Sequence, residues 1–402
     1  MASNEYDAIV VGARCAGSPT AMLLARLGHK VLVLDKDHFP SDTLSTHMIH
    51  PPGIGELQKW GVLDRVVATG CPAIERYIFN FGPFTISGRP RPVDGISVGY
   101  GPRRTILDKL LVDAAAEAGA EIREGFTVDE LLFQDGRVTG VRGHGPHGTS
   151  ITEHARVVIG ADGRHSLVAK AVAPESYNER PPIESGYYTY LSNLPAEGFE
   201  VYIRPHRGWG VVPTNDGLTL VVIGWPYAEF ENNKKDVEGT YMRSLDLAPE
   251  FAERVRRAKR EAPIRGGAVP NFFRKPFGPG WALVGDAGYT KDPVTAWGMS
   301  DGFRDASLCA AALAQWLSGT RPFDEAMADY QKERDEHSLP MFGVTCNFAT
   351  LEPPPPEMQQ LLGATAANQE AQDQFVSMMA GTLPVQAFFA PENVGRIMAA
   401  GR

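Results

Sequence analysis

Three short motifs built from glycine and aspartate carry most of the chemistry that this chain could perform. They are GARCAG at 12–17, GADG at 160–163 and GDAG at 285–288, and each follows an apolar run. Glycine lets a backbone turn tightly and approach a phosphate, while an acid at the end of a strand can accept hydrogen bonds from a ribose. Together the motifs predict one bound dinucleotide.

The first motif reads as the turn of a βαβ unit. An apolar strand at 8–11 precedes it, a helical pattern follows it, and a second strand at 31–34 ends at Asp35, an acid roughly 20 residues further on. The position usually held by the central glycine is Arg14. Its side chain must either point away from the phosphates or add its own charge to them.

In order and spacing, the three motifs resemble those of the group A flavoprotein monooxygenases of the para-hydroxybenzoate hydroxylase type, with the related geranylgeranyl reductases and flavin-dependent halogenases. The resemblance covers about the first 330 residues. It implies an α/β fold, with a Rossmann-like FAD-binding domain, an inserted antiparallel β-sheet substrate domain and a C-terminal helical region. It also implies FAD as the cofactor, with NADPH or NADH as a transient electron donor.

By this resemblance, Gly12 and Gly17 flank the FAD pyrophosphate, Asp35 holds the adenosine ribose, and Asp286 accepts hydrogen bonds from the ribityl chain. Arg104 is the basic residue near the pyrophosphate. The full set of cofactor-binding residues expected in this way is Gly12, Arg14, Ala16, Gly17, Asp35, Lys36, Arg104, Asp162, Gly163, Asp286, Pro293, Gly298, Met299 and Ser300.

The helix expected after Pro293 can also be inferred from the residues alone, independently of the resemblance. From Met299 to Leu317, apolar residues recur at steps of four and three, which predicts a buried amphipathic helix. A helix N-terminus carries unpaired N–H groups and a positive partial charge. Aimed at the N1 and O2 edge of a flavin, it would stabilise the reduced, anionic cofactor.

The middle motif departs from its relatives after Ser166. Ala169 and Lys170 stand where relatives usually carry an arginine, so the preference between NADPH and NADH stays open. The chain has no second complete glycine fingerprint, which argues against a separate nicotinamide domain.

The same pattern predicts a discontinuous domain organisation. The FAD-binding domain comprises 1–76, 98–178 and 265–335; the substrate-binding β-sheet domain comprises 77–97 and 179–264; and 336–402 form a helical region. Short alternating runs between 182 and 226 indicate the strands of the substrate sheet. The helical tail could cap the substrate cavity or pack on a second subunit.

A substrate cavity is expected between this sheet and the flavin. Packing in the sheet core explains each tyrosine at least as well as substrate contact does, and Trp297 has the strongest case because it lies between Pro293 and Gly298. The candidate wall residues are Tyr188, Tyr190, Tyr202, Trp209, Val211, Trp225 and Trp297.

Two histidines, His47 and His50, occupy a loop after the second strand, and histidine titrates near neutral pH. We therefore expect His47, Trp297 and Pro293 to serve at the reacting centre, with a packed or capping role as the alternative for both histidines. No metal site is expected, because the histidines lack an accompanying ligand set.

Composition narrows the function further. The chain has 402 residues, of which 43% are hydrophobic and 22% charged, and its net charge of −9 disfavours nucleic acid and anionic membrane surfaces. No apolar run reaches the roughly 18 residues of a membrane span. Four scattered cysteines suggest no disulfide framework. We expect a cytoplasmic monomer or homodimer whose partners are O₂ and a small organic molecule.

The leading hypothesis is an FAD- and NAD(P)H-dependent monooxygenase, a hydroxylase that inserts one atom of O₂ into a small aromatic or polycyclic substrate through a flavin hydroperoxide. The first alternative is an FAD-dependent alkene reductase, because GWGVVP at 208–213 is similar to a segment of prenyl reductases. A halogenase is a weaker alternative, since Val211 replaces the second tryptophan of the halogenase motif. A flavin-binding protein without turnover is the alternative outside enzymes.

Overall fold

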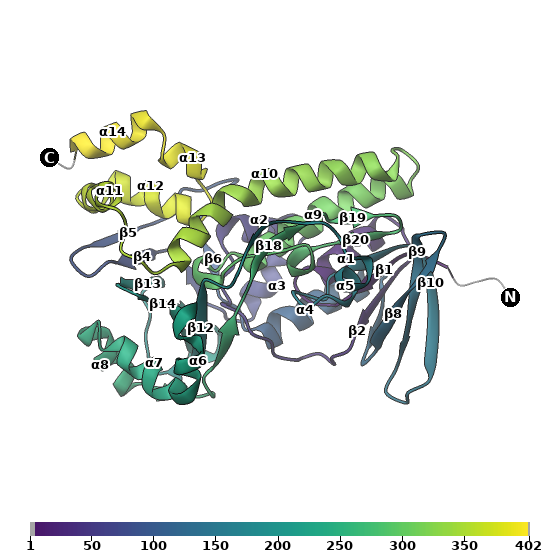
Figure 1. The fold of residues 1–402 in the computed structure, drawn as a ribbon, viewed down its shortest axis with the longest axis horizontal. Coiled ribbons are helices and arrows are strands. Elements are labelled where there is room, and N and C mark those ends of the chain that lie inside the picture. Colours follow the sequence, from purple (N-terminus) through teal and green to yellow (C-terminus); the bar gives the residue numbers. More distant parts are fainter. Residues whose placement is uncertain (1–4, 401–402) are drawn as a thin grey trace.

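The computed structural model describes residues 5–400. The outermost residues of two predicted segments, 1–4 and 401–402, lie outside this described part. Two sheets form opposite ends of the molecule, with the N-terminal strand in the first sheet and the C-terminal helices beside the second (Figure 1). No helix among the described residues combines the length and the apolar character of a membrane span.

The first sheet has the order β19-β20-β10-β1-β2-β7, and β1 runs parallel to both β2 and β10. A hairpin of β8 and β9 extends from β10. The strands are β1 (Tyr6–Val11), β2 (Val31–Asp35), β7 (Glu121–Glu124), β8 (Thr127–Gln134), β9 (Arg137–His144), β10 (Ser150–Gly160), β19 (Phe277–Gly278) and β20 (Trp281–Leu283).

Strand β1 is apolar from Ala8 to Val11 because both faces of this sheet are covered there. Ala8 and Val10 pack with residues of α1 (Gly17–Arg26), α4 (Arg104–Glu117) and α9 (Gly298–Leu317). Ile9 and Val11 pack on the other face with the β8 and β9 hairpin and α5 (Leu167–Val172). The predicted helix after Pro293 is confirmed as α9.

Strands β1, β10 and β20 end in register, with Val11 opposite Gly160 and Gly160 opposite Leu283. The three glycine and aspartate motifs begin where these strands end. They therefore meet at the carboxyl edge of one parallel sheet, where ligands of open α/β sheets bind.

The second sheet has the order β16-β12-β15-β14-β13-β4-β5, and β17 also pairs with β12. Its strands are β4 (Tyr77–Asn80), β5 (Thr85–Gly88), β12 (Glu184–Ser192), β13 (Phe199–Arg204), β14 (Arg207–Pro213), β15 (Thr219–Pro226), β16 (Lys259–Arg260) and β17 (Arg265–Ala268). Strand β17 pairs with β12 and continues this sheet to residue 268, past the predicted boundary at 264.

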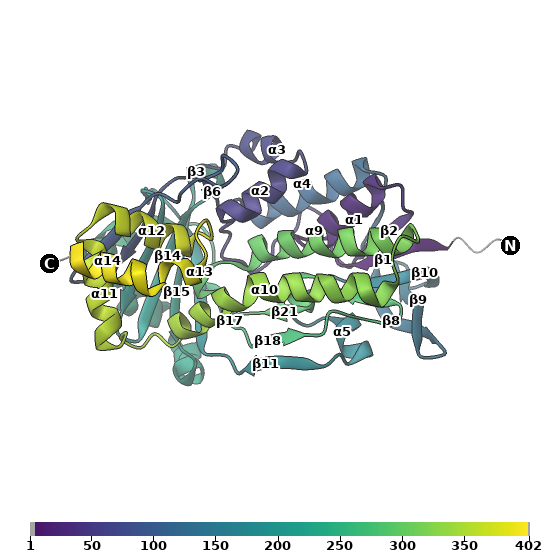
Figure 2. The same ribbon diagram turned by 90° about the horizontal axis from the view of Figure 1, so that it is seen from above.

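Helices cover both faces of the second sheet (Figures 1 and 2). One face packs on α7 and α8, and the other packs partly on the C-terminal helices. These helices are α6 (Phe230–Asn233), α7 (Val237–Leu245), α8 (Pro249–Arg257), α11 (Pro356–Ala366), α12 (Gln369–Met379), α13 (Val385–Phe388) and α14 (Pro391–Ala400). The tail therefore packs on its own chain.

Connecting elements join the two sheets. The long helix α10 runs beside α9 (Figure 2), and a three-stranded sheet of β11, β18 and β21 lies near them. Their bounds, with those of the other short elements, are α10 (Phe323–Ala349), β11 (Ser176–Arg180), β18 (Asn271–Arg274), β21 (Tyr289–Thr290), α2 (Pro51–Lys59), α3 (Leu63–Ala68), β3 (Ala73–Ile74), β6 (Gly99–Tyr100), η1 (Asn215–Gly217), η2 (Tyr227–Glu229), η3 (Lys234–Asp236), η4 (Gly285–Ala287) and η5 (Pro293–Thr295).

Candidate active site

The glycines of the first and third motifs are required by close packing. A Cβ on Gly12, whose φ is +102°, would lie 2.5 Å from the carbonyl oxygen of Ala161. A Cβ on Gly17 would lie 1.8 Å from the carbonyl oxygen of Gly12, and one on Gly285 would lie 2.8 Å from the Cβ of Ala16. All three motifs thus touch, and a side chain at any of these glycines would separate them.

Asp35 organises the first turn from the end of β2. Its Oδ2 accepts a hydrogen bond of 2.7 Å from the N–H of Ala13, and its Oδ1 accepts one of 2.9 Å from the N–H of Asp37. Burial raises the pKa of Asp35, while these N–H groups lower it. The carboxylate keeps further lone pairs, which suits it to a ribose. The neighbouring Lys36 is exposed.

Arg14 points toward protein carboxylates. Its guanidinium contacts Asp108 at 2.5 Å, Asp37 at 2.8 Å and the hydroxyl of Ser41 at 2.8 Å. The sequence left open whether Arg14 points away from the phosphates or adds its charge to them. In the structure its charge is already paired with protein carboxylates. Its effect on a phosphate would be indirect.

Asp108 is an organising residue that the sequence analysis missed. It is fully buried on α4 and accepts two hydrogen bonds from Arg104, at 2.9 and 3.0 Å, as well as the contact from Arg14. The available signal was its spacing of four residues from Arg104 on a helix. Asp108 thus joins two arginines beside the turn of the first motif, and Arg14 also pairs with Asp37.

Asp286 and Gly298 are the open positions of the site. Asp286 lies in η4 with an exposed side chain and has no hydrogen-bond partner among the described residues. Although its side chain reaches the surface, many protein atoms surround the carboxyl group. The resulting loss of solvation raises the pKa of Asp286 above the ordinary range, while Arg104 and Arg164 oppose that shift. Gly298 is exposed, and no atom lies within 4 Å of a Cβ added there.

Helix α9 begins at Gly298 without a side-chain cap, because Trp297 holds the N-cap position. The N–H groups of its first turn, which include those of Met299 and Ser300, have no partners inside the helix. A ligand can accept hydrogen bonds from such N–H groups. Pro293 opens the preceding turn, η5, and is partly exposed.

The middle motif is mostly engaged within its own loop. Asp162 accepts hydrogen bonds from the Ser166 hydroxyl at 2.5 Å and from the Leu167 N–H at 2.6 Å, at the start of α5. Gly163 has a φ of +77°, and the space beside it is open. Ala169 is buried and Lys170 is exposed.

The residues present fit FAD. The motifs converge at the carboxyl edge of the first sheet, Asp35 and Asp286 each have a carboxylate near that edge, and the start of α9 faces open space at Gly298. A Cβ would fill the space at Gly298. This combination of acceptors, helix dipole and glycine clearance is the donor and acceptor set that a flavin dinucleotide requires.

His50 joins the loop after β2 to the start of α9. Its Nε2 donates to the carbonyl oxygen of Thr295 at 3.0 Å, and its Nδ1 accepts from the Tyr77 hydroxyl at 3.1 Å. The ring stacks on Trp297 with centroids 4.9 Å apart, and Ser300 accepts a bond from the His50 N–H. His50 thus has the packed role that the sequence analysis held as an alternative.

Trp297 is tied into the same buried assembly. Its Nε1 donates to the carbonyl oxygen of Met379 at 3.1 Å, and Gly381 packs against its ring. The C-terminal helices therefore fix the residue that precedes α9. Its expected place beside the flavin follows from its position at the N-cap, and its indole N–H is occupied by protein.

His47 is fully buried and bonded at both ring nitrogens. Its Nδ1 donates to the carbonyl oxygen of Ser45 at 2.9 Å, so its Nε2 accepts the 2.6 Å hydrogen bond from the Tyr190 hydroxyl. Burial lowers the pKa of His47 to about 4, which makes the neutral ring the form present at pH 7. Tyr188 lies edge-on to both rings, at 6.1 Å from His47 and 5.8 Å from Tyr190.

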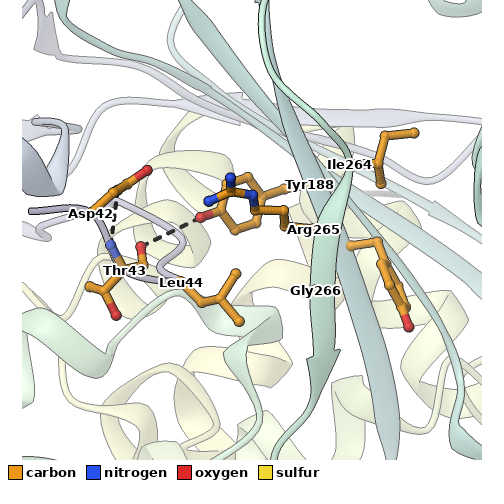
Figure 3. Close-up of a pocket in the computed structure, with 8 residues that line it drawn as sticks. Asp42, Thr43, Leu44, Tyr188, Ile264, Arg265 and Gly266 are labelled. Carbon is orange, nitrogen blue, oxygen red and sulfur yellow. Dashed lines mark hydrogen bonds between the residues drawn. The ribbon is translucent and has the colours of Figure 1, made fainter.

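A pocket of about 480 Å³ opens beside Tyr188 (Figure 3). The loop after β2 forms one side and the edge of the second sheet forms the other, and the Tyr188 hydroxyl bonds the Thr43 carbonyl at 3.5 Å. The lining residues are Asp42, Thr43, Leu44, Tyr187, Tyr188, Ile264, Arg265 and Gly266. One aromatic side chain thus belongs both to this pocket and to the surroundings of His47.

Four of the predicted wall residues lie on the face of the second sheet opposite to Tyr188 and Tyr190. They pack under α7 and α8, in the same apolar cluster as Tyr241 and Phe251. The residues that line the pocket beside Tyr188 do not include these four. The four are Tyr202, Trp209, Val211 and Trp225.

A family model described as "FAD binding domain" matches residues 5–341. This chain belongs to that family. It is 26% identical over 339 residues to a digeranylgeranylglycerophospholipid reductase of Methanocella arvoryzae, covering 82% of this chain and 83% of the relative. It is 27% identical over 352 residues to the squalene epoxidase erg1 of Schizosaccharomyces pombe, covering 83% of this chain and 73% of the relative.

The structure of the flavin-dependent brominase Bmp2 superposes with a TM-score of 0.82 at 16% identity, covering 99% of this chain and 98% of that one. The likeness establishes the fold. Together these findings confirm the predicted fold class and the resemblance to the group A flavoproteins, and they identify the protein as an enzyme, an FAD-dependent oxidoreductase.

Proposed function

We propose that the protein is an NAD(P)H-dependent monooxygenase that transfers one oxygen atom of O₂ to a small aromatic or polycyclic organic substrate. When bound, FAD would take hydride from NADH or NADPH and activate O₂. The observation that carries the proposal is the pocket beside Tyr188, because an aromatic wall there adjoins the buried pair of His47 and Tyr190.

The protein's residues contribute binding, proton handling and exclusion of water. The neutral His47 accepts a hydrogen bond from the Tyr190 hydroxyl through its Nε2, which fixes the orientation of that hydroxyl for hydrogen bonding and proton exchange with a substrate. Asp286, Gly298 and the first turn of α9 would hold the flavin, and the α9 dipole would favour its reduced anion. Pro293 and Trp297 would set the turn at the ring.

Alkene reduction is the second candidate. It is supported by the relative from Methanocella arvoryzae, which is named as a reductase and matches over most of both chains. Halogenation has less support in the site. Trp209, from the segment that contains part of the halogenase motif, lies under α8 and does not line the pocket beside Tyr188.

Oxygen consumption by the FAD-loaded protein tests the proposal. NADH and NADPH would be tried with a panel of phenols, fused aromatic ketones and prenyl alkenes. Uptake stimulated by an aromatic compound, with an oxygenated product, is the expected result. Anaerobic flavin reduction followed by loss of an alkene would favour the reductase, and no oxidation of either nucleotide would favour a binding protein without turnover.

A paired variant makes the test specific to the site. Tyr190→Phe removes the hydroxyl that bonds His47 and should lower substrate-stimulated uptake by about tenfold or more. Tyr202→Phe removes a comparable hydroxyl on the opposite face, where it bonds Glu200, and should retain uptake. Equal losses in both variants would contradict a proton-handling role for Tyr190.

A further inference from the structure

Two buried carboxyl groups meet where the second sheet joins the loop that leads into α9. Glu184, the first residue of β12, is 4% exposed, and Asp292, which precedes Pro293, is 1% exposed. The Glu184 N–H donates to Asp292 Oδ2 at 3.3 Å, and each side chain shifts the pKa of the other. Among the described residues, Glu184 Oε2 is buried without a hydrogen-bond partner. The two residues are 108 positions apart, so this contact connects two parts of the fold.

Asp292 also shapes the loop. Its Oδ1 accepts a hydrogen bond of 3.1 Å from the N–H of Val294 and thereby caps η5. Its own N–H donates to Asn271 of β18 at 2.7 Å. Since Thr295 of the same turn bonds His50 and α9 starts three residues later, the placement of Asp292 fixes the approach to the helix start.

The surroundings of the pair supply no neutralising cation. Among residues 5–400, neither carboxyl lies within ion-pair distance of a lysine, arginine or histidine, and the nearby Lys291 is paired with Asp301. Gly224 of β15 packs against the Glu184 carboxyl, Asn271 faces Asp292 from β18, and the Cys346 thiol of α10 lies next to Asn271.

Two neighbouring carboxylates that are buried without a cation cannot both stay ionised, so we expect the pair to hold a proton. Burial raises the pKa of Glu184 well above its usual range, and the neighbouring Asp292 raises it further. Burial also raises the pKa of Asp292, to about 6, while its hydrogen bonds oppose that shift. Glu184 is therefore the partner that keeps the proton, and Asp292 is the acceptor.

We propose that Glu184 is a positioning residue of the flavin site, which as a neutral acid donates to Asp292 and so holds η5 and the start of α9 against the substrate sheet. The inference deepens the proposed function and rests on its FAD site, while it is independent of the oxygen chemistry. Neither Glu184 nor Asp292 belongs to any of the three glycine motifs.

The direction of the pH effect follows from the shared proton. A carboxylic acid whose pKa is raised on folding binds more protons in the folded state between its ordinary pKa and the raised one. The folded protein is therefore weakened as pH rises through that window. Glu184→Gln keeps a donor for Asp292 at every pH and should remove this part of the pH dependence.

The experiment measures FAD dissociation constants and thermal unfolding of the full chain, with and without FAD, from pH 5 to pH 9. The ratio of the parent's FAD dissociation constant to that of Glu184→Gln should rise with pH, by at most about tenfold per pH unit. Glu184→Ala, which lacks the donor, should bind FAD more weakly than Glu184→Gln over the whole range. Asp292→Asn should also flatten the pH dependence, because it removes the anion from the pair.

Glu200→Gln is the matched control. Glu200 is another buried glutamate of the second sheet, but it pairs with Arg254 on the face under α8 and has no contact with Asp292 among the described residues. The corresponding ratio of dissociation constants for Glu200→Gln should not change from pH 6 to 9. The inference would be overturned if the ratio of dissociation constants for Glu184→Gln did not change with pH, or if the ratio for Glu200→Gln changed as much. A pH-dependent ratio for Glu184→Gln in a protein that shows no oxygen uptake would retain the inference and refute the proposed function.

Discussion

At the scale of residues, the acids near the cofactor edge differ in how far the protein already uses them. Asp35 accepts two backbone N–H groups, Asp108 pairs with two arginines, and Asp162 caps the start of α5. Asp286 is exposed and has no protein hydrogen bond among the described residues. It is therefore the acid most available to a ligand.

Replacing Asp286 by Asn should weaken FAD binding by about tenfold, or ~1.4 kcal/mol, because a charge-assisted acceptor is lost. Fluorescence of released FAD and the yellow colour of the purified protein report the change. Asp94→Asn, at an exposed turn far from the motifs in sequence, is the control and should bind FAD as the parent does. A variant of Asp286 as yellow as the parent would refute its assignment.

The buried histidines predict a loss of stability in acid. Burial lowers the pKa values of His47 and His50 to about 4, below the ordinary 6.5, so the unfolded chain binds more protons between these limits. Each neutral ring contributes fully above about pH 6.5, and up to about 3 kcal/mol is lost as pH falls toward 4. Thermal unfolding of His50→Gln should show a shallower decline than the parent from pH 6.5 to 4.5. An identical decline would show that His50 is not responsible.

At the scale of elements, the start of α9 combines an exposed glycine with an uncapped helix N-terminus. Protein side chains pack around Met299 and Ser300, which are buried, while Gly298 faces open space. Met299 and Ser300 therefore serve the packing of the helix, whereas Gly298 is accessible to a ligand.

Gly298→Ala should therefore separate cofactor binding from folding. No protein atom obstructs the added methyl group, and alanine favours a helix by up to about 1 kcal/mol, so the FAD-free protein should unfold at the same temperature or slightly higher. FAD affinity should fall because the methyl group occupies cofactor space. Gly343→Ala, in the interior of α10 and also unobstructed, is the control. Unchanged FAD affinity in Gly298→Ala would place the flavin elsewhere.

The sequence was informative where local chemistry decides the structure and uninformative where packing decides it. Glycine turns after apolar strands indicated the edge at which the three motifs meet, and the apolar spacing indicated α9. The face of each strand in the second sheet was not readable, because helices cover both faces and both rows of side chains are apolar. That is why Tyr188 and Trp225 looked equivalent in the sequence. The contact between Glu184 and Asp292 spans too many residues to leave a local pattern.

At the scale of the whole molecule, the C-terminal helices join the second sheet to the residue that precedes α9. Phe375 of α12 packs edge-on against Phe79 of β4 at 5.2 Å and against Phe388 of α13 at 5.7 Å. The carbonyl of Met379, at the end of α12, holds Trp297. The sequence left open whether the tail caps the substrate cavity or packs on a second subunit, and the structure shows it packed on the second sheet of its own chain.

This arrangement predicts that Phe375→Ala destabilises the entire protein. Removing a fully buried ring leaves a cavity and should cost about 3 to 5 kcal/mol, seen as a lower unfolding temperature. Phe389→Ala is the matched control, since that ring is 36% exposed and should cost much less. If the tail unfolded separately, Phe375→Ala would instead give two transitions, with the larger one unchanged.

The most direct test of the central claim is the fate of oxygen in a turnover. FAD-loaded protein would be given NADH or NADPH, an aromatic compound that stimulates uptake, and O₂ labelled with a heavy isotope, and the products would be weighed by mass spectrometry. We predict one labelled oxygen atom in the product, with one nucleotide and one O₂ consumed for each product molecule. Nucleotide oxidation that saturates a double bond and leaves no label in the product would contradict a monooxygenase and establish a reductase.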